Sequence, residues 1–173
     1  MKTIKSSFTF FVLLTVLLAC ASNRTDQANQ EASASISGLN GNPVSGTADF
    51  VQDGDEVELE LNLQGLPPGN HAVHIHTGTC GDTTTIGDHW NPTGAPHGQR
   101  GVDEAFHRGD IGNIEIGSDS TGTLTLSAED WTIGGSDSTN VIGNLVIVHA
   151  GADDYTSQPS GNAGDMIGCG TIQ

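Results

Sequence analysis

Residues 56–63 alternate strictly between apolar and polar side chains, and this pattern restricts the fold more than any other in the chain. The apolar positions are Val57, Leu59, Leu61 and Leu63, and each is separated from the next by Glu or Asn. Successive side chains of a β-strand point to opposite faces, so a period of two predicts a strand with one buried face. Half-buried strands of this kind are typical of antiparallel sheets.

Short strand-like runs recur along the rest of the chain, with Gly- and Asp-rich turns between them. They cover residues 34–40, 46–52, 56–63, 71–76, 111–116, 121–127, 144–149 and 167–172. No long window carries apolar residues at helical spacing. A length of 173 residues favours one domain. We therefore predict an all-β fold of eight antiparallel strands, arranged as a sandwich or barrel. Two long irregular stretches, 77–110 and 150–166, are predicted to be functional loops.

The first 19 residues have the pattern of an export signal. Lys2 and Lys5 precede an apolar run, residues 8–18, that is short for a membrane span. The run ends in Leu-Leu-Ala-Cys, which resembles the lipobox of bacterial lipoproteins and makes Cys20 the expected lipidated residue. An ordinary secretory signal is the alternative. We predict a signal peptide over 1–19, lipidated Cys20 with a polar tether over 20–33, and a folded domain over 34–173. The protein is then extracytoplasmic and attached to a membrane by its lipid.

The charge balance excludes two classes of function. The chain has 5 Lys and Arg against 21 Asp and Glu, a net charge of −16. A nucleic-acid-binding surface or a polybasic patch for anionic lipid needs a cluster of cations that five residues cannot supply. The excess of acids favours solubility and repels anions at long range.

Three cysteines are informative once export is assumed. If Cys20 carries lipid, Cys80 and Cys169 are the one pair that remains. An exported compartment permits a disulfide between them, and two free thiols are the alternative.

The seven histidines indicate metal chemistry. They are His71, His74, His76, His89, His97, His107 and His149. His74 and His76 are two apart in a predicted strand, so their rings share a face. His107 lies three residues before Asp110, which suits a tetrahedral zinc site with other loop histidines. Imidazole also suits copper. The alternative for His74 and His76 alone is a pair of solvated polar residues, but the number of histidines favours two metal sites.

These residues resemble bacterial copper–zinc superoxide dismutases over about residues 34–173. The matching blocks are GLPPGNHAVHIH (65–76), HWNPTGAPHG (89–98), HRGDIGN (107–113), NLVIVHAGADD (144–154) and GNAGDMIGCGTI (161–172). The resemblance implies an eight-stranded Greek-key fold with one copper and one zinc per subunit. It also implies disproportionation of superoxide to dioxygen and hydrogen peroxide.

The resemblance assigns a role to each site residue. It implies copper ligands at His74, His76, His89 and His149, and zinc ligands at His89, His97, His107 and Asp110, with His89 as the bridge. Asp153 is implied to link His74 to His97, as carboxylates that orient metal ligands do. Cys80 and Cys169 match the family's disulfide, His71 matches a structural histidine, and Trp90 is expected to serve in packing.

One position departs from the family pattern. Where the family has an arginine that draws the anion to copper, this chain has Met166, preceded by Asp165. We expect Arg100 and Arg108 to be exposed loop cations rather than replacements for that charge. Two functions stay open: a superoxide dismutase slowed by Met166, or an extracytoplasmic copper- and zinc-binding protein with little activity. Monomer and homodimer are both compatible with the sequence.

Overall fold

The structure is a computed structural model and describes residues 29–173. The expected signal peptide, Cys20 and residues 21–28 of the tether lie outside the described residues. Homodimer formation likewise stays a prediction.

Nine strands make up almost all of the regular structure, and every ladder between them is antiparallel. They are β1 Gln30–Gly38, β2 Ser45–Asp53, β3 Glu56–Gln64, β4 Gly69–Gly78, β5 Ile86–His89, β6 Asp110–Ile116, β7 Thr121–Ala128, β8 Leu145–His149 and β9 Met166–Thr171. A single 3₁₀ turn, Thr83–Thr85, precedes β5. The predicted all-β fold is confirmed.

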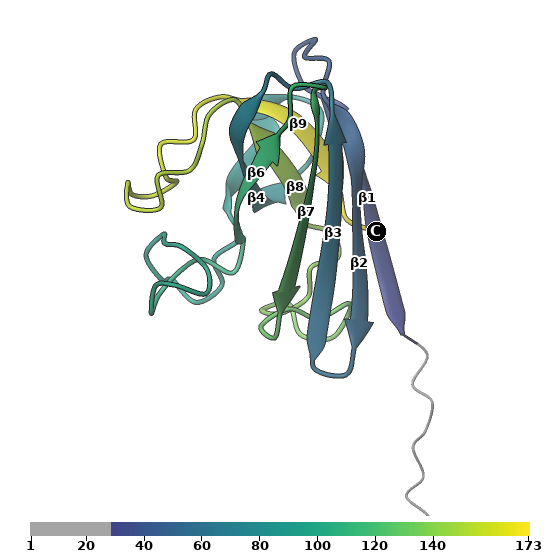
Figure 1. Cartoon of the computed structure of the whole chain (residues 1–173). Coiled ribbons are helices and arrows are strands. Elements are labelled where there is room, and N and C mark those ends of the chain that lie inside the picture. Colours follow the sequence, from purple (N-terminus) through teal and green to yellow (C-terminus); the bar gives the residue numbers. More distant parts are fainter. Residues whose placement is uncertain (1–28) are drawn as a thin grey trace, which may run out of the picture.

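The strands form one curled sheet in the order β5–β4–β8–β9–β1–β2–β3–β7, with β6 also paired to β4. Strands β1, β2 and β3 form a meander, and the chain then crosses from β3 to β4 rather than pairing them. Figure 1 shows β1, β2, β3 and β7 in front, and β4, β6, β8 and β9 behind them. The crossing gives the Greek-key connection that the resemblance implies.

The start of β1 and the presence of β5 are the main differences from the sequence prediction. Strand β1 begins at Gln30 rather than residue 34, because Ala32 and Ala34 alternate into the core and Gln30 already pairs with Gln52 of β2. Residues 30–33 therefore belong to the sheet and not to the tether. Strand β5 was expected to be loop, since its four residues IGDH carry too short a pattern to be seen without their partner β4.

The alternating face of β3 lies in the centre of the core. Val57, Leu59 and Leu61 have no exposed surface, and they pack with the apolar faces of β1, β2 and β4. Trp131, in the loop between β7 and β8, is also fully buried and packs against Phe50 with ring centroids 6.0 Å apart. Burying a large apolar side chain contributes about 2–3 kcal/mol, so this layer supports the strands that carry the histidines.

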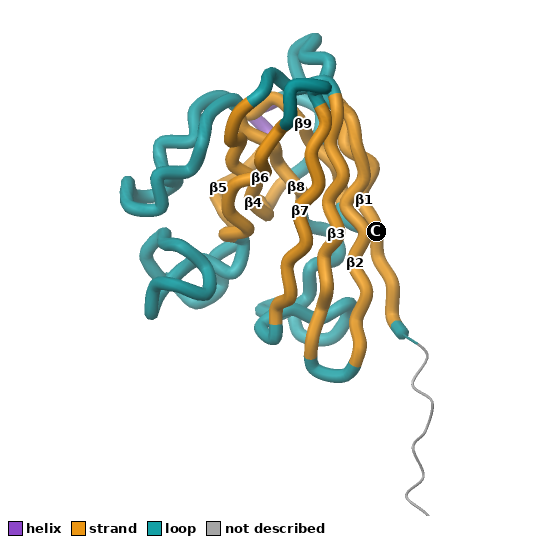
Figure 2. Tube along the Cα trace, in the orientation of Figure 1, coloured by secondary structure: helices purple, strands orange, loops and turns teal. Residues whose placement is uncertain are grey.

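The two long loops project from the same side of the sheet, away from β1 to β3 (Figure 2). They include the segments that follow β5 and β8. Among residues 29–173 no helix has the length and apolar character needed to cross a membrane.

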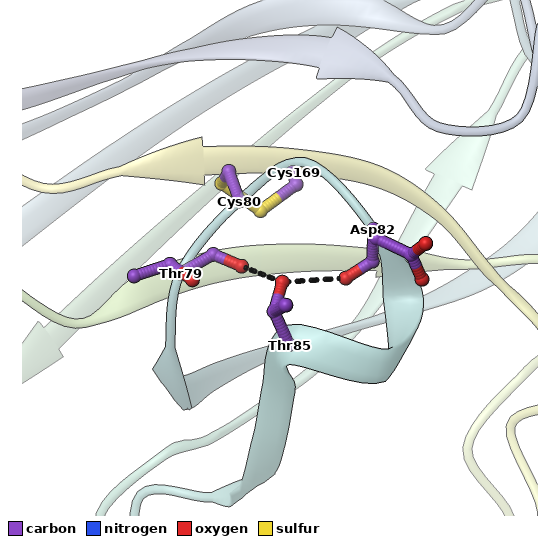
Figure 3. The surroundings of a disulfide bond; sticks show 5 residues. All are labelled: Thr79, Cys80, Asp82, Thr85 and Cys169. Atoms are coloured by element: carbon purple, nitrogen blue, oxygen red, sulfur yellow. Dashed lines mark hydrogen bonds between the residues drawn. A yellow bond between two sulfur atoms is a disulfide. The ribbon is translucent and has the colours of Figure 1, made fainter.

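A disulfide joins Cys80 to Cys169, as predicted, and ties the first long loop to β9. The bonded residues are 89 apart in sequence. In the chain-entropy description, closing a loop of that size contributes about 4–5 kcal/mol. Figure 3 shows the turn beside the bridge, where the Thr85 hydroxyl lies 2.8 Å from the Thr79 carbonyl oxygen and 2.7 Å from that of Asp82. The bridge and the turn hold β5, and therefore His89 at its end, against the sheet.

Candidate metal centre

Three paired strands bring four histidines together at one end of β4. His74 and His76 lie on β4, His149 ends β8, and His89 ends β5 directly opposite His76. One ligand atom from each of the four lies within 4.8 Å of the others, and all four side chains are buried. We call His74, His76, His89 and His149 the first cluster.

Three histidines of the first cluster, those on β4 and β8, each make a hydrogen bond through one ring nitrogen. His74 Nε2 lies 2.8 Å from Asp153 Oδ2, His76 Nδ1 lies 2.9 Å from the Gly87 carbonyl oxygen, and His149 Nδ1 lies 3.2 Å from that of Gly164. The held nitrogen carries the proton, which leaves the other with its lone pair. Those other nitrogens are buried and have no partner in the described structure: His74 Nδ1, His76 Nε2 and His149 Nε2.

The second cluster comes from the first long loop and the start of β6. Its members are His89, His97, His107 and Asp110, and all are buried. Asp110 Oδ1 lies 2.8 Å from His89 Nδ1, 3.0 Å from His97 Nδ1 and 3.3 Å from His107 Nδ1. His107 Nδ1 and His89 Nδ1 are 3.3 Å apart.

These separations match those of a tetrahedral metal site. Ligands about 2.0–2.1 Å from a central zinc ion are about 3.3 Å from one another. His97 Nδ1 makes no hydrogen bond despite its 3.0 Å approach to Asp110. Three ring nitrogens that converge on one carboxylate oxygen, with His97 Nδ1 left without a hydrogen bond, are the arrangement expected of groups that share a cation.

His89 belongs to both clusters through opposite ring nitrogens. Its Nδ1 faces Asp110 in the second cluster, while its Nε2 is a buried atom without a partner among residues 29–173. The two clusters therefore share one imidazole, as the resemblance implies.

Asp153 links the two clusters from behind. Its Oδ2 meets His74 Nε2 at 2.8 Å and its Oδ1 meets His97 Nε2 at 2.9 Å. Gly161 lies against this carboxylate with φ of +66°, and a Cβ there would collide with Asp153 Oδ1. Glycine is thus required at residue 161 both by the left-handed backbone and by the close approach.

The two long loops are joined beside His97. The side-chain amide of Gln158 accepts from the His97 backbone N–H at 2.8 Å and donates to the His97 carbonyl at 2.8 Å. These two hydrogen bonds resemble those between paired β-strands. They hold the loop after β8 and the loop after β5 together at His97, a residue of the second cluster.

Arg100 is buried, and the expectation that it is an exposed loop cation is wrong. Its side chain is only 8% exposed, pairs with Asp130 at 2.5 Å, and lies over the rings of Phe106 and Trp131. It also donates to the carbonyl oxygens of Arg108 and Asp110. Cations stack favourably on aromatic faces, which explains why Arg100 turns inward to brace the segment that carries His107 and Asp110.

Arg108 is half-buried and likewise engaged, since it donates to the Asp130 carbonyl at 2.6 Å. Arg100 and Arg108 are the only Lys or Arg residues among residues 29–173. Neither borders the cavity in front of the first cluster.

Burial and the two carboxylates act in opposite directions on the pKa values of the histidines. It lowers the pKa of His76 to about 2 and that of His149 to about 3, and lowers that of His74 and His107 as well. Burial also opposes the charged form of His97, but Asp110 and Asp153 outweigh it and raise the pKa of His97 to about 9.

The two carboxylates stay ionised. Burial favours their neutral forms, but hydrogen bonds from the surrounding histidines outweigh it and hold the pKa of Asp110 and of Asp153 well below the usual range. In the first cluster, His74, His76 and His149 have lowered pKa values and buried, unpartnered ring nitrogens, and such neutral imidazoles bind divalent cations.

A cavity of about 480 Å³ opens in front of the first cluster. Its wall includes His76, His89 and His149, together with Met166. The expected acid Asp165 does not border it but faces a neighbouring hollow. The acid on the cavity wall is Asp88, which the sequence analysis did not single out. Its signal was its place directly before His89, on the exposed face of β5.

Two further expectations hold. The buried ring of His71 lies 3.0 Å from each of two carbonyl oxygens, those of Pro67 and His149, which agrees with a structural role. Trp90 is 5% exposed and packs in the main core.

The fold and the two clusters define a class: an antiparallel Greek-key β-protein with two histidine-rich candidate metal sites that share His89. Residues 44–172 match the family described as copper/zinc superoxide dismutase. The chain belongs to this family, whose members normally bind copper and zinc. A similar solved structure is described as that of the clock protein EA4, with 30% sequence identity and a TM-score of 0.74. The match covers 83% of this chain and 94% of the other.

We predict that Asp153→Asn weakens metal binding at both clusters by about 10–100-fold, the usual effect of losing a carboxylate that orients ligands. An amide has one acceptor oxygen and cannot receive from both His74 and His97. Competition with a chromophoric chelator measures both affinities. Asp154→Asn, at the exposed neighbouring acid, is the control. A loss confined to one cluster would contradict the linking role.

We predict that the metal-free protein loses stability as the pH falls from about 6.5 to about 4.5. In this range the unfolded histidines take up protons while folded His76 and His149, with lowered pKa values, stay neutral. The unfolded state therefore binds more protons, and acid favours it. His97 acts in the opposite sense: its contribution is complete below 6.5 and is lost as the pH rises through about 9. Urea midpoints measured with a chelator present test this, and an unchanged midpoint at about pH 4.5 would contradict it.

Proposed function

We propose that the protein disproportionates superoxide, converting two superoxide anions and two protons into dioxygen and hydrogen peroxide. Copper binds at the first cluster and zinc at the second. The observation that carries the proposal is His89, whose two ring nitrogens face the two clusters. One shared imidazole between an open, cavity-facing cluster and a closed tetrahedral one joins a reactive site to a structural site.

The two metals have different chemistry when bound: copper exchanges single electrons with superoxide, whereas zinc has no redox chemistry and orders the loop. The side chains of the protein would bind and orient the metals and give the substrate access to them. His74, His76 and His149 present preorganised lone pairs because acceptors fix their opposite nitrogens. The cavity gives a small substrate access to this cluster.

His89 is the residue placed to handle a proton. Its Nδ1 lies 2.8 Å from Asp110 Oδ1, its Nε2 is buried without a partner, and its side chain borders the cavity. A proton taken up at Nε2 can be delivered to a peroxide anion in the cavity. Among residues 29–173, His89 is the one side chain that belongs to both clusters.

A second candidate is a copper- and zinc-binding protein with little turnover. The observation in its favour is Met166 on the cavity wall, where no basic side chain among residues 29–173 replaces the missing cation. Loss of one unit charge about 5 Å from the substrate, at an effective dielectric of about 20, costs at most about 3 kcal/mol. Screening reduces the loss to about 10–100-fold in rate, which slows a dismutase but does not abolish it.

We also propose that the domain acts outside the cytoplasm, attached through Cys20. The Cys80–Cys169 disulfide supports an oxidising compartment. With β1 beginning at Gln30, residues 21–29 would form the tether.

The direct test is metal analysis combined with a superoxide assay on the purified domain. We expect one copper and one zinc per chain, and turnover that disappears when copper alone is removed. The His89→Ala variant should lose most activity, since it removes a ligand of both clusters. Stoichiometric metal without turnover would favour the metal-binding function instead.

We predict that Met166→Arg raises the rate of the fully metallated protein by about 10–100-fold at low ionic strength. The new cation should attract the anion, so the rate should also fall more steeply with added salt. Met166→Leu, which keeps size without charge, is the matched control and should behave as the wild type. An unchanged rate for Met166→Arg would refute the electrostatic argument.

A further inference from the structure

The cavity in front of the first cluster has a wall with an unusual charge pattern. Apart from the histidines of the two clusters, its wall contains one ionisable side chain, Asp88. The rest of the wall is glycine, proline, asparagine, serine and Met166. The formal charge of Asp88 is negative, so the wall contributes negative charge where the substrate enters.

The two arginines of the described domain make their contacts away from this cavity. Arg100 is buried between Phe106 and Trp131 and paired with Asp130, and Arg108 donates to the Asp130 backbone. Both brace the segment around the second cluster. Neither can swing to the cavity without breaking contacts that hold His107 and Asp110.

The net charge of the whole domain is negative as well. All but Asp26 of the 21 acidic residues lie in the described part of the chain. Several stand on the outer faces of β2 and β3, where Asp49 is directly opposite Glu60 and Asp53 is opposite Glu56. A surface with this excess lowers the local concentration of anions.

From these observations we infer that the access cavity admits small uncharged molecules in preference to anions, with Asp88 as a specificity-determining residue. The inference rests on the proposed function in taking copper as the metal behind the cavity. Asp88 lies directly before His89, on the strand that ends at the cavity. Superoxide, as an anion, would then enter the cavity less readily than an uncharged molecule of similar size.

Azide binding to the copper- and zinc-loaded protein tests the selectivity without turnover. The Cu(II) spectrum reports azide affinity, and the relaxation of water protons by Cu(II) reports access of an uncharged molecule. For the wild type we expect weak azide binding that tightens as salt is added, because salt screens repulsion. Water access should be independent of salt.

The Asp88→Asn variant should bind azide about two- to tenfold more tightly at low salt, with a smaller salt dependence and unchanged water relaxation. This range corresponds to one unit charge acting over about 6–8 Å at an effective dielectric of about 40–80. Glu58→Gln, which removes an acid from the outer face of β3, is the matched control and should leave azide affinity unchanged.

The outcomes separate the inference from the proposed function. A normal Cu(II) spectrum with azide binding that weakens in salt would overturn the inference alone. Equal effects of Asp88→Asn and Glu58→Gln would overturn the role of Asp88. A protein with no Cu(II) spectrum after loading would overturn both, whereas absence of superoxide turnover with the expected azide behaviour would overturn only the proposed function.

Discussion

The structure depends on the convergence of six imidazoles and one carboxylate, all of them buried. Five ring nitrogens there are buried and unpartnered, and leaving such groups without partners costs free energy that the core must offset. Divalent cations remove that cost, because they accept the lone pairs that the other contacts leave free. Three features keep these seven groups close to one another. They are the strand register that pairs His76 with His89, the glycine at residue 161, and the buried side chain of Arg100.

Much of the fold could be predicted because the alternation of apolar and polar side chains can be recognised even in short strands. Val57 to Leu63 alternate in the sequence and are buried in the sheet, and the same pattern placed eight strands within a few residues of their bounds. The pairing of His74 with His76 followed from the same period. The disulfide partners could be narrowed to Cys80 and Cys169 by counting, and the structure confirms that pair.

Other features could not be predicted because they depend on partners distant in sequence. The four residues of β5 become a strand only beside β4. Arg100 is an ordinary loop cation until Phe106 and Trp131 enclose it and Asp130 pairs with it. Sequence proximity suggested Asp165 as the acid near the cavity, whereas the strand end brings Asp88 there. Each case concerns a side chain whose direction is set by tertiary contacts.

The two hydrogen bonds between the Gln158 side chain and the His97 backbone bear on how the two clusters would bind metal ions. Since the loops on either side are fastened together, ordering one restricts the other. Binding free energies obey reciprocity, so the factor by which an ion in one cluster strengthens binding in its neighbour must hold equally in reverse. If both clusters bind metal, the coupling between them would not depend on which ion arrives first.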